Sequence, residues 1–179
     1  MNKQSLFFLL LNLTGGSAVL GSYAHGVLKN TELRSELWGA VPDYIQPYYT
    51  ICMFLAAIGY FFFTGYIIKY VSFDTTQIFG CYNFTIINLL YAGFLIPSAL
   101  WIYMTFAMII NPSVLLWIGI RIILFTVGFS SIGLFLAFFF SNFEKSSWLF
   151  YAGIAGLIPF SIQAMVLDAL VWPYYFPIK

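Results

Sequence analysis

Two ionisable residues, Arg121 and Asp168, stand inside long apolar stretches of this 179-residue sequence. Burying either charge alone in the hydrocarbon of a membrane costs at least about 2.5 to 3.5 kcal/mol, so each needs a compensating contact. A substrate or an ion can supply that contact, which makes both residues candidate ligand-binding residues. A structural pair that holds two helices together, or an arginine whose side chain reaches back to the membrane surface, would satisfy them equally well.

The depths of these two residues are matched. With a rise of about 1.5 Å per helical residue, Arg121 lies roughly 10 Å inward from Val114, where its apolar stretch begins. Asp168 lies roughly 12 Å inward from Phe176, where its own stretch ends at the same membrane face. Opposite charges at one level predict a salt bridge, made directly or through one water molecule.

Uncharged polar residues give a second group of candidates. Gln163 and Asn88 also fall inside apolar stretches, where an interhelical hydrogen bond is a commoner role for an amide than a ligand contact. His25, the single histidine, stands at a membrane boundary. It can relay protons or ligate haem, although a hydrogen-bonded boundary residue is the commoner outcome and no second axial ligand stands out.

Aromatic residues make up 22% of the chain and divide into two sets. One set gathers near the predicted membrane surfaces, as interfacial belts do, and includes Trp38 and Trp172. The other set lies deeper, where the polar atoms of Tyr and Trp need partners, so these rings should face the interior of a helix bundle. There they either pack together or form the wall of a pocket for a flat apolar ligand. The deep residues are Tyr60, Tyr91, Trp101 and Tyr103.

The known catalytic and metal-binding arrangements need more residues than this sequence offers. One histidine cannot form a multi-histidine metal site, and Cys52 and Cys81 cannot supply the four thiolates of a zinc or iron–sulfur centre. An intramembrane aspartyl protease needs two carboxylates, whereas Asp168 is the one acidic residue within the apolar stretches. We therefore predict no catalytic residues and no metal ligands, and the sequence identifies no cofactor.

Membrane-spanning helices must position the candidate residues. Hydrophobic residues make up 62% of the chain and charged residues 7%, against about 25% charged residues in an ordinary soluble domain. Lys and Arg total 7 and Asp and Glu total 6, which leaves no basic surface for nucleic acid. A helix needs about 20 apolar residues to cross a bilayer. Five stretches reach that length and predict one all-α domain over residues 1–179, a five-transmembrane-helix bundle with spans at about 5–24, 47–68, 84–110, 114–140 and 148–176.

The connections between spans are short, apart from an interfacial linker over residues 25–46. Within it Asn30 or Thr31 can cap a short helix that ends at Trp38. The leucines of this helix and Trp38 would lie on the membrane interface, while its charged residues would face water. Further along, Asn111–Pro112 predicts a tight turn that makes the third and fourth spans an antiparallel hairpin.

An odd number of spans places the two ends of the chain on opposite faces of the membrane. We name the face that holds the N-terminus face A and the other face B. Lys and Arg are equally numerous on the two faces, but Lys3 flanks the first span directly, so we expect face A to be cytoplasmic. A cleaved signal peptide is an alternative for the first span. Cys52 falls near face B and Cys81 near face A, which excludes a disulfide between them.

Two patches of sequence and the layout of the spans carry a family resemblance. Trp38–Pro42, followed by Pro47, is similar in layout to the aromatic and proline linker that precedes the second helix of the translocator protein family, the tryptophan-rich sensory proteins. Leu157–Phe160 resembles the leucine–proline–aromatic step in the last helix of that family. The family's double proline is missing, and its asparagine late in the last helix has no counterpart, the nearest polar residue being Asp168. The resemblance implies a five-helix bundle, able to form a homodimer, that binds tetrapyrroles or sterol-like ligands near the long linker.

We therefore expect an integral membrane protein that lies in the lipid bilayer and binds a small apolar or amphipathic ligand between its helices, as a receptor, sensor or carrier. The ligand would enter from face B. The alternative is a non-catalytic subunit or assembly factor of a larger membrane complex, whose aromatic surfaces contact other subunits or a second copy of the chain. A lipid-modifying enzyme is a further alternative. The candidate ligand-binding residues are Arg121, Asp168, Trp38, Trp101, Tyr103, Gln163, Trp172 and His25.

Overall fold

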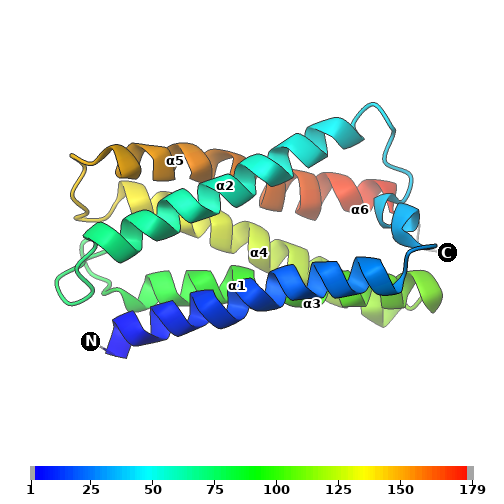
Figure 1. Cartoon of the computed structure of the whole chain (residues 1–179), viewed down its shortest axis with the longest axis horizontal. Helices are drawn as coiled ribbons and strands as arrows, with labels where there is room; N and C mark the ends of the chain where they lie inside the picture. The colour runs from blue at the N-terminus through cyan, green and yellow to red at the C-terminus, as the bar shows by residue number, and fades with distance from the viewer. Residues whose placement is uncertain (1–2, 177–179) are drawn as a thin grey trace.

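The computed structural model describes residues 3–176, which form an all-α bundle (Figure 1). The last span is one continuous helix made of three consecutive elements, the middle of which is a π-helix. Beyond isolated bridges at Ile78, the described residues form no β-structure. The elements in chain order are α1 (Lys3–Lys29), the 3-10 helix η1 (Arg34–Trp38), α2 (Gln46–Tyr70), α3 (Thr85–Ile110), α4 (Val114–Phe139), α5 (Trp148–Ser161), the π-helix η2 (Ile162–Val171) and α6 (Trp172–Tyr175).

Within residues 3–176, five helices are long and apolar enough to cross a membrane, which confirms the predicted bundle. Helices suit such apolar sequences because each satisfies its backbone N–H and C=O groups internally, where lipid offers no partners. The second to fifth spans begin and end close to their predicted bounds. The first differs, because α1 starts at Lys3 and continues to Lys29 rather than ending near residue 24. His25 therefore lies within α1 and not at its end.

The linker between α1 and α2 is less helical than predicted. Asn30 does not cap a new helix, because its Nδ2 donates to the carbonyl of Gly26 at 2.8 Å and so completes α1. The 3-10 helix η1 is the only helix in this linker, and it is shorter than the expected segment. Gly39 follows it with φ +58°, and a Cβ there would lie 2.9 Å from the Tyr175 carbonyl oxygen. Glycine thus lets the linker approach the end of the last span.

The remaining connections are short and tied to one another. α3 ends at Ile110 and α4 begins at Val114, so the turn at Asn111 and Pro112 makes the predicted antiparallel hairpin. On face A, the loop after α2 and the loop after α4 are joined. The Phe79 N–H donates to the Phe140 carbonyl at 2.9 Å, and Asn142 accepts from the Gln77 N–H at 2.9 Å. This end of the bundle is therefore held by its loops as well as by its helices.

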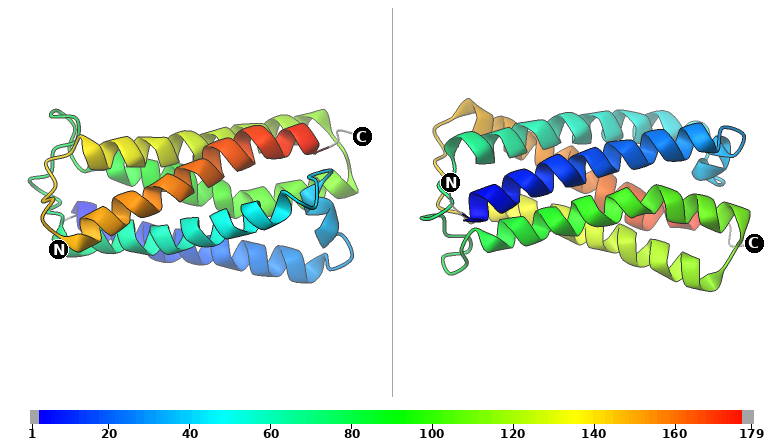
Figure 2. Two further views of the ribbon diagram at one scale, coloured as in Figure 1. Left: turned by 90° about the horizontal axis from the view of Figure 1, so that it is seen from above. Right: turned by 60° about the horizontal axis from the view of Figure 1, so that its bottom comes forward.

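The five spans form a ring with one loosely packed side. α1 packs on α3, α3 on α4, α4 on the last span, and the last span on α2 (Figure 2). α1 and α2 are joined by the long linker, yet they lack the close helix packing of the other four pairs. We name the boundary between them the α1–α2 seam. Among the described residues, it is the one side of the ring without close helix packing.

The last span changes its packing partner on its way from face A to face B. α5 packs mainly on α2, whereas η2 packs mainly on α4 (Figure 2, left). The contact with α2 is closest at two glycines, since a Cβ added to Gly59 would lie 2.6 Å from the Cα of Gly156. No side chain fits between these backbones. Beyond that point the last span leaves α2 and makes room in the face B half of the bundle.

A proline precedes this change of partner. Pro159 has no N–H, so it cannot donate to the carbonyl of Ala155 one turn earlier. Such a missing bond commonly bends a helix or changes its register, and the π-helix η2 begins shortly afterwards, at Ile162. Proline alone is not sufficient, because α3 continues as an α-helix past Pro97.

The face A half of the bundle holds the larger core. Tyr66 and Tyr91 are fully buried there, and their hydroxyls have partners. The hydroxyl of Tyr91 lies 2.9 Å from Oγ1 of Thr64, and that of Tyr66 donates to the Glu144 carbonyl at 2.7 Å. The prediction that deep tyrosines face inward is right for Tyr91. Its aromatic neighbours in this core include Phe8, Phe63, Phe84 and Phe94.

Candidate functional site

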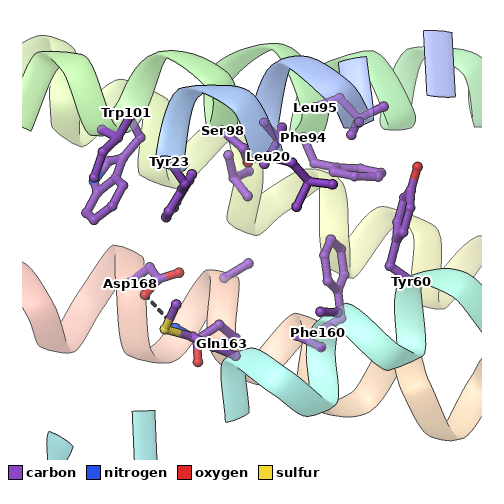
Figure 3. Close-up of a pocket in the computed structure, with 18 of the residues that line it drawn as sticks. Leu20, Tyr23, Tyr60, Phe94, Leu95, Ser98, Trp101, Phe160, Gln163 and Asp168 are labelled. Atoms are coloured by element: carbon purple, nitrogen blue, oxygen red, sulfur yellow. Dashed lines mark hydrogen bonds between the residues drawn. The ribbon is translucent and has the colours of Figure 1, made fainter. Parts of the chain in front are cut away.

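A cavity of about 820 Å³ runs between the spans, and we name it the central cavity (Figure 3). All five spans and η1 contribute to its wall. Its volume lies within the range of about 300 to 1,000 Å³ that small-molecule sites occupy. Its lining residues include Asn12, Leu20 and Tyr23 of α1, Trp38 of η1, Tyr49 and Tyr60 of α2, Phe94, Ser98 and Trp101 of α3, and Phe160, Gln163, Asp168 and Trp172 of the last span.

The central cavity opens along the α1–α2 seam. Three of its lining side chains belong to the outer surface as well, because Leu13, Leu20 and Phe61 are 70%, 71% and 69% exposed. A polar contact crosses the seam where the Tyr60 hydroxyl donates to Oδ1 of Asn12 at 2.7 Å. That bond lies toward face A. On the face B side of it, apolar and aromatic side chains of both helices continue the cavity wall, among them Leu20 and Met53.

The linker lies at the face B end of the central cavity. Trp38 packs edge-on against Tyr49, with 5.9 Å between ring centroids, and both rings line the cavity. The carbonyl of Leu37 accepts a hydrogen bond of 2.8 Å from Nε1 of Trp172. The hydroxyl of Tyr49 donates to the Leu167 carbonyl at 2.9 Å, which fixes α2 to η2. Trp38 and Trp172, both predicted ligand-binding residues, thus border the cavity together.

Asp168 and Gln163 form a hydrogen-bonded pair on one side of the last span. Nε2 of Gln163 donates to Oδ1 of Asp168 at 2.8 Å (Figure 3). Residues five apart point about 140° away from each other on an α-helix, which has 3.6 residues per turn. The wider turn of a π-helix, with bonds between residues five apart, brings them to the same side. The π-helix η2 is therefore what makes this pair.

The carboxyl group of Asp168 faces the interior of the cavity. Figure 3 shows Asp168 across the open space from Tyr23 and Trp101, which lie on the opposite wall. These two rings are stacked, with centroids 5.7 Å apart, and Trp101 meets Trp172 edge-on at 5.7 Å. Nε1 of Trp101 is buried and has no hydrogen-bond partner among the described residues. The one acidic group of the cavity thus faces three aromatic rings.

Arg121 does not pair with Asp168, so the predicted salt bridge is wrong. The Arg121 guanidinium donates to the carbonyl of Ala169 at 2.7 Å and lies 4.8 Å from the centre of the Phe125 ring. It lines a separate, shallow groove on α4 with Trp117 and Phe129, outside the central cavity. The two residues do lie at matched depths, because Arg121 reaches the residue after Asp168. The two side chains nevertheless leave their helices on different sides.

Two further predicted residues lie outside the cavity. Nδ1 of His25 is 3.1 Å from the hydroxyl of Tyr103, and this pair joins α1 to α3 on the exposed surface. Tyr103 is 44% exposed, which corrects the expectation that it faces the bundle interior. The Tyr103 hydroxyl has its partner, His25, on the neighbouring helix α1 at the outer surface, not in the interior of the helix bundle. His25 is a hydrogen-bonded residue of α1, in agreement with the commoner of the two roles considered for it.

The amides inside the spans take different roles. Nδ2 of Asn88 donates to Oε1 of Gln4 at 2.7 Å, an interhelical bond of the predicted kind between α3 and α1. Gln163 instead bonds within its own span, and its Oε1 is buried without a partner among residues 3–176. Sequence reasoning missed the pair of Gln163 with Asp168. Their spacing of five residues, just after Pro159, is the signal that could have revealed it.

The central cavity has little capacity for a metal ion. Within residues 3–176, no group of three or more His, Cys, Asp or Glu side chains is placed to hold one. Cys52 and Cys81 are free thiols, and the Sγ of Cys52 contacts the Pro159 carbonyl at 3.4 Å. The wall is otherwise apolar and aromatic. Such a cavity can hold an organic molecule by burying its apolar surface, with Asp168 as the main point of polar contact.

Comparison of the sequence with protein-family models gives no match, and searches of curated proteins and of solved structures give none either. Function is therefore inferred from the cavity itself.

Proposed function

We propose that this chain is a multi-pass membrane protein that binds a small apolar or amphipathic molecule in the central cavity, as a receptor, sensor or carrier. The observation that carries this proposal is a cavity of about 820 Å³ lined by all five spans. Well-packed bundles fill such a space with side chains, because leaving it empty forfeits contact energy. The resemblance to the translocator family, which implies a ligand near the long linker, supports the same location.

The seam supplies a route of entry that the sequence did not suggest. An apolar ligand dissolved in the bilayer can pass between α1 and α2, because these helices lack the close packing of the other neighbouring pairs. Entry from face B would require η1 and Trp38 to move, since both border that end of the cavity. We therefore place the principal entry at the seam, on the face B side of the bond between Tyr60 and Asn12.

Cavity filling tests the proposal. Ser98 of α3 points into the cavity, whereas Ile96 of the same helix is 55% exposed on the outer surface (Figure 3). The full chain is purified from its native membrane in mild detergent, and bound small molecules are identified by native mass spectrometry. We expect the wild type and the control Ile96→Trp to carry a bound molecule and Ser98→Trp to lose it. A wild type without any bound small molecule would contradict the proposal.

The alternative, a non-catalytic subunit or assembly factor, is favoured by one observation. α1 packs closely on α3 alone, and most of its surface is not covered within the chain. The same purification distinguishes the two functions. Stoichiometric co-purification of other membrane proteins, together with no bound small molecule, would identify a subunit. A lone particle with a bound molecule supports the receptor, sensor or carrier.

The orientation of the chain is part of the proposal, with face A and the N-terminus in the cytoplasm. The exposed Cys81 lies in the loop after α2 on face A, and Cys52 lies within α2. A membrane-impermeant maleimide should therefore label intact cells poorly and permeabilised cells well, with Cys81→Ser as the unlabelled control. Labelling of Cys81 in intact cells would reverse the orientation. A tag after Lys179, which lies outside the described residues, should report the opposite face.

A further inference from the structure

We infer that the ligand of the central cavity is an amphipathic cation, an amine attached to a flat apolar body, whose ammonium group binds Asp168. This inference rests on the proposed function, because it names the class of molecule that the same cavity takes. It is carried by a carboxyl group without a counter-charge among the described residues, which faces a wall of aromatic rings.

The first step is the charge of the cavity wall. Among the lining residues only Asp168 and Arg34 are charged, and Arg34 is exposed on η1, where water screens it. Arg121, the other cation at the level of Asp168, is bound to the Ala169 carbonyl. No described basic side chain forms an ion pair with Asp168, and Gln163 supplies its one hydrogen bond. A buried charge of this kind needs a partner, and a cationic ligand supplies one.

The second step is the aromatic wall opposite the carboxyl group. Tyr23, Trp101 and Trp172 form a continuous series of ring contacts, with 5.7 Å between the first two centroids and 5.7 Å between the second two. An ammonium group is attracted to the faces of such rings, and the attraction grows where water is excluded. Carboxylate and rings thus favour the same kind of group, a substituted ammonium. An anion would meet the like charge of Asp168 and is disfavoured.

The third step is the apolar part of the ligand. From Asp168 toward face A, the cavity wall is formed by Leu20, Phe94, Leu95 and Phe160 (Figure 3). Of these, Phe94 and Phe160 meet edge-on, with centroids 5.2 Å apart. These side chains offer no hydrogen bonds, so they select an aromatic or aliphatic body. The ligand therefore lies with its amine toward face B and its apolar body toward the middle of the bundle.

A matched pair of probes tests this inference. The probes are 2-(dimethylaminomethyl)naphthalene, a cation at neutral pH, and 2-isobutylnaphthalene, in which a CH group replaces the nitrogen. The full chain is placed in nanodiscs of phosphatidylcholine, which has no net charge, and binding is measured by equilibrium dialysis against empty nanodiscs. We expect the amine to bind at least about tenfold more tightly than its isostere, as a hydrogen bond to a charged group implies.

Variants then assign the preference to one carboxylate. Asp168→Asn keeps the size of the side chain and an acceptor for Gln163, so we expect it to bind both probes equally. Glu32→Gln removes an acidic residue from the exposed linker on the same face and should keep the preference. Should Asp168→Asn fail to fold, the preference of the wild type for the amine still tests the inference.

Each remaining outcome is decisive. Equal binding of both probes to the wild type would overturn the cationic ligand while leaving the proposed function intact, because the cavity would then take neutral molecules. An amine preference that persists in Asp168→Asn would overturn the role of Asp168. Binding of neither probe would count against both this inference and the proposed cavity function.

Discussion

The face A and face B halves of this bundle are built from the same five helices and similar residues, yet the larger core lies in the face A half, whereas the face B half has a smaller core beside Asp168 and the central cavity. Near face A, α5 lies on α2, and the large aromatic rings meet with their hydroxyls paired. Near face B, η2 lies on α4 instead and leaves space beside α2. The comparison teaches that hydrophobicity and aromatic content do not decide where a cavity forms. The path of a single helix decides it.

The largest effect is expected where α2 and α5 touch. Gly59→Ala places a Cβ 2.6 Å from the Cα of Gly156, so the helices must separate, which should cost about 3 kcal/mol of unfolding free energy. A Cβ added to Gly65 of the same helix would meet nothing within 4 Å, so Gly65→Ala should be neutral or slightly stabilising. Unfolding by SDS in mixed micelles measures both. Equal losses of unfolding free energy in the two variants would show that the contact between Gly59 and Gly156 is no tighter than the surroundings of Gly65.

The next effect concerns the buried hydroxyl pair of the face A half. Tyr91→Phe removes the buried hydrogen bond to Oγ1 of Thr64 and should cost about 2 kcal/mol. Thr64→Val should cost a similar amount by itself. The double variant should lose less than the sum, because it leaves no unpaired hydroxyl. Additive losses, measured in the same unfolding experiment, would mean that this bond does not contribute to the face A half.

A third prediction distinguishes the side of the last span that contacts Arg121 from the side on which Asp168 lines the cavity. Arg121→Gln removes a charged hydrogen bond to the Ala169 carbonyl and should lower stability by about 1.5 kcal/mol without changing probe binding. Asp168→Asn should abolish the amine preference with little loss of stability. Exchanging the two charges should therefore restore neither property. Recovery of stability in the exchanged variant would revive the direct salt bridge that the structure contradicts.

The smallest effect is expected at the face B end of the central cavity. Trp38→Ala removes a ring that packs on Tyr49 beside the cavity, and it should weaken binding of the naphthalene amine about fivefold, or about 1 kcal/mol. Glu32→Ala on the exposed part of the same linker should have little effect. If the two variants behave alike in dialysis, the linker is a tether and does not border the ligand.

The fold follows from the sequence because lipid leaves an apolar stretch few alternatives to a helix. The turn at Pro112 and the start of the last span at Trp148 could therefore be located closely. The end of α1 could not, since His25 and Lys29 suggest a boundary but the helix still gains backbone hydrogen bonds by continuing. Polar residues near a membrane face, such as His25, do not by themselves end a helix.

The site was predictable only in part, for a reason of geometry. Asp168 and Trp101 could be selected because polar atoms within spans need partners, and both line the cavity. Trp172, assigned to the interfacial belt, lines it as well. Arg121 satisfied the same rule with a backbone carbonyl, which no sequence pattern reveals. If the last span is assumed to be α-helical throughout, Gln163 and Asp168 point to different sides of it, so their contact is not expected. The π-helix that joins them depends on packing against α4, a contact between distant parts of the chain.

The order of the helices around the ring also constrains how the chain is made. Gly59 belongs to the second span to be synthesised, and its partner Gly156 belongs to the last. At about 5 to 20 residues per second, the intervening chain of roughly 100 residues takes about 5 to 20 s to emerge. In a membrane, the glycine face of α2 would have lipid as its neighbour during that interval. The bilayer would then hold a half-built ring, open along α2, until the final helix inserts and closes it.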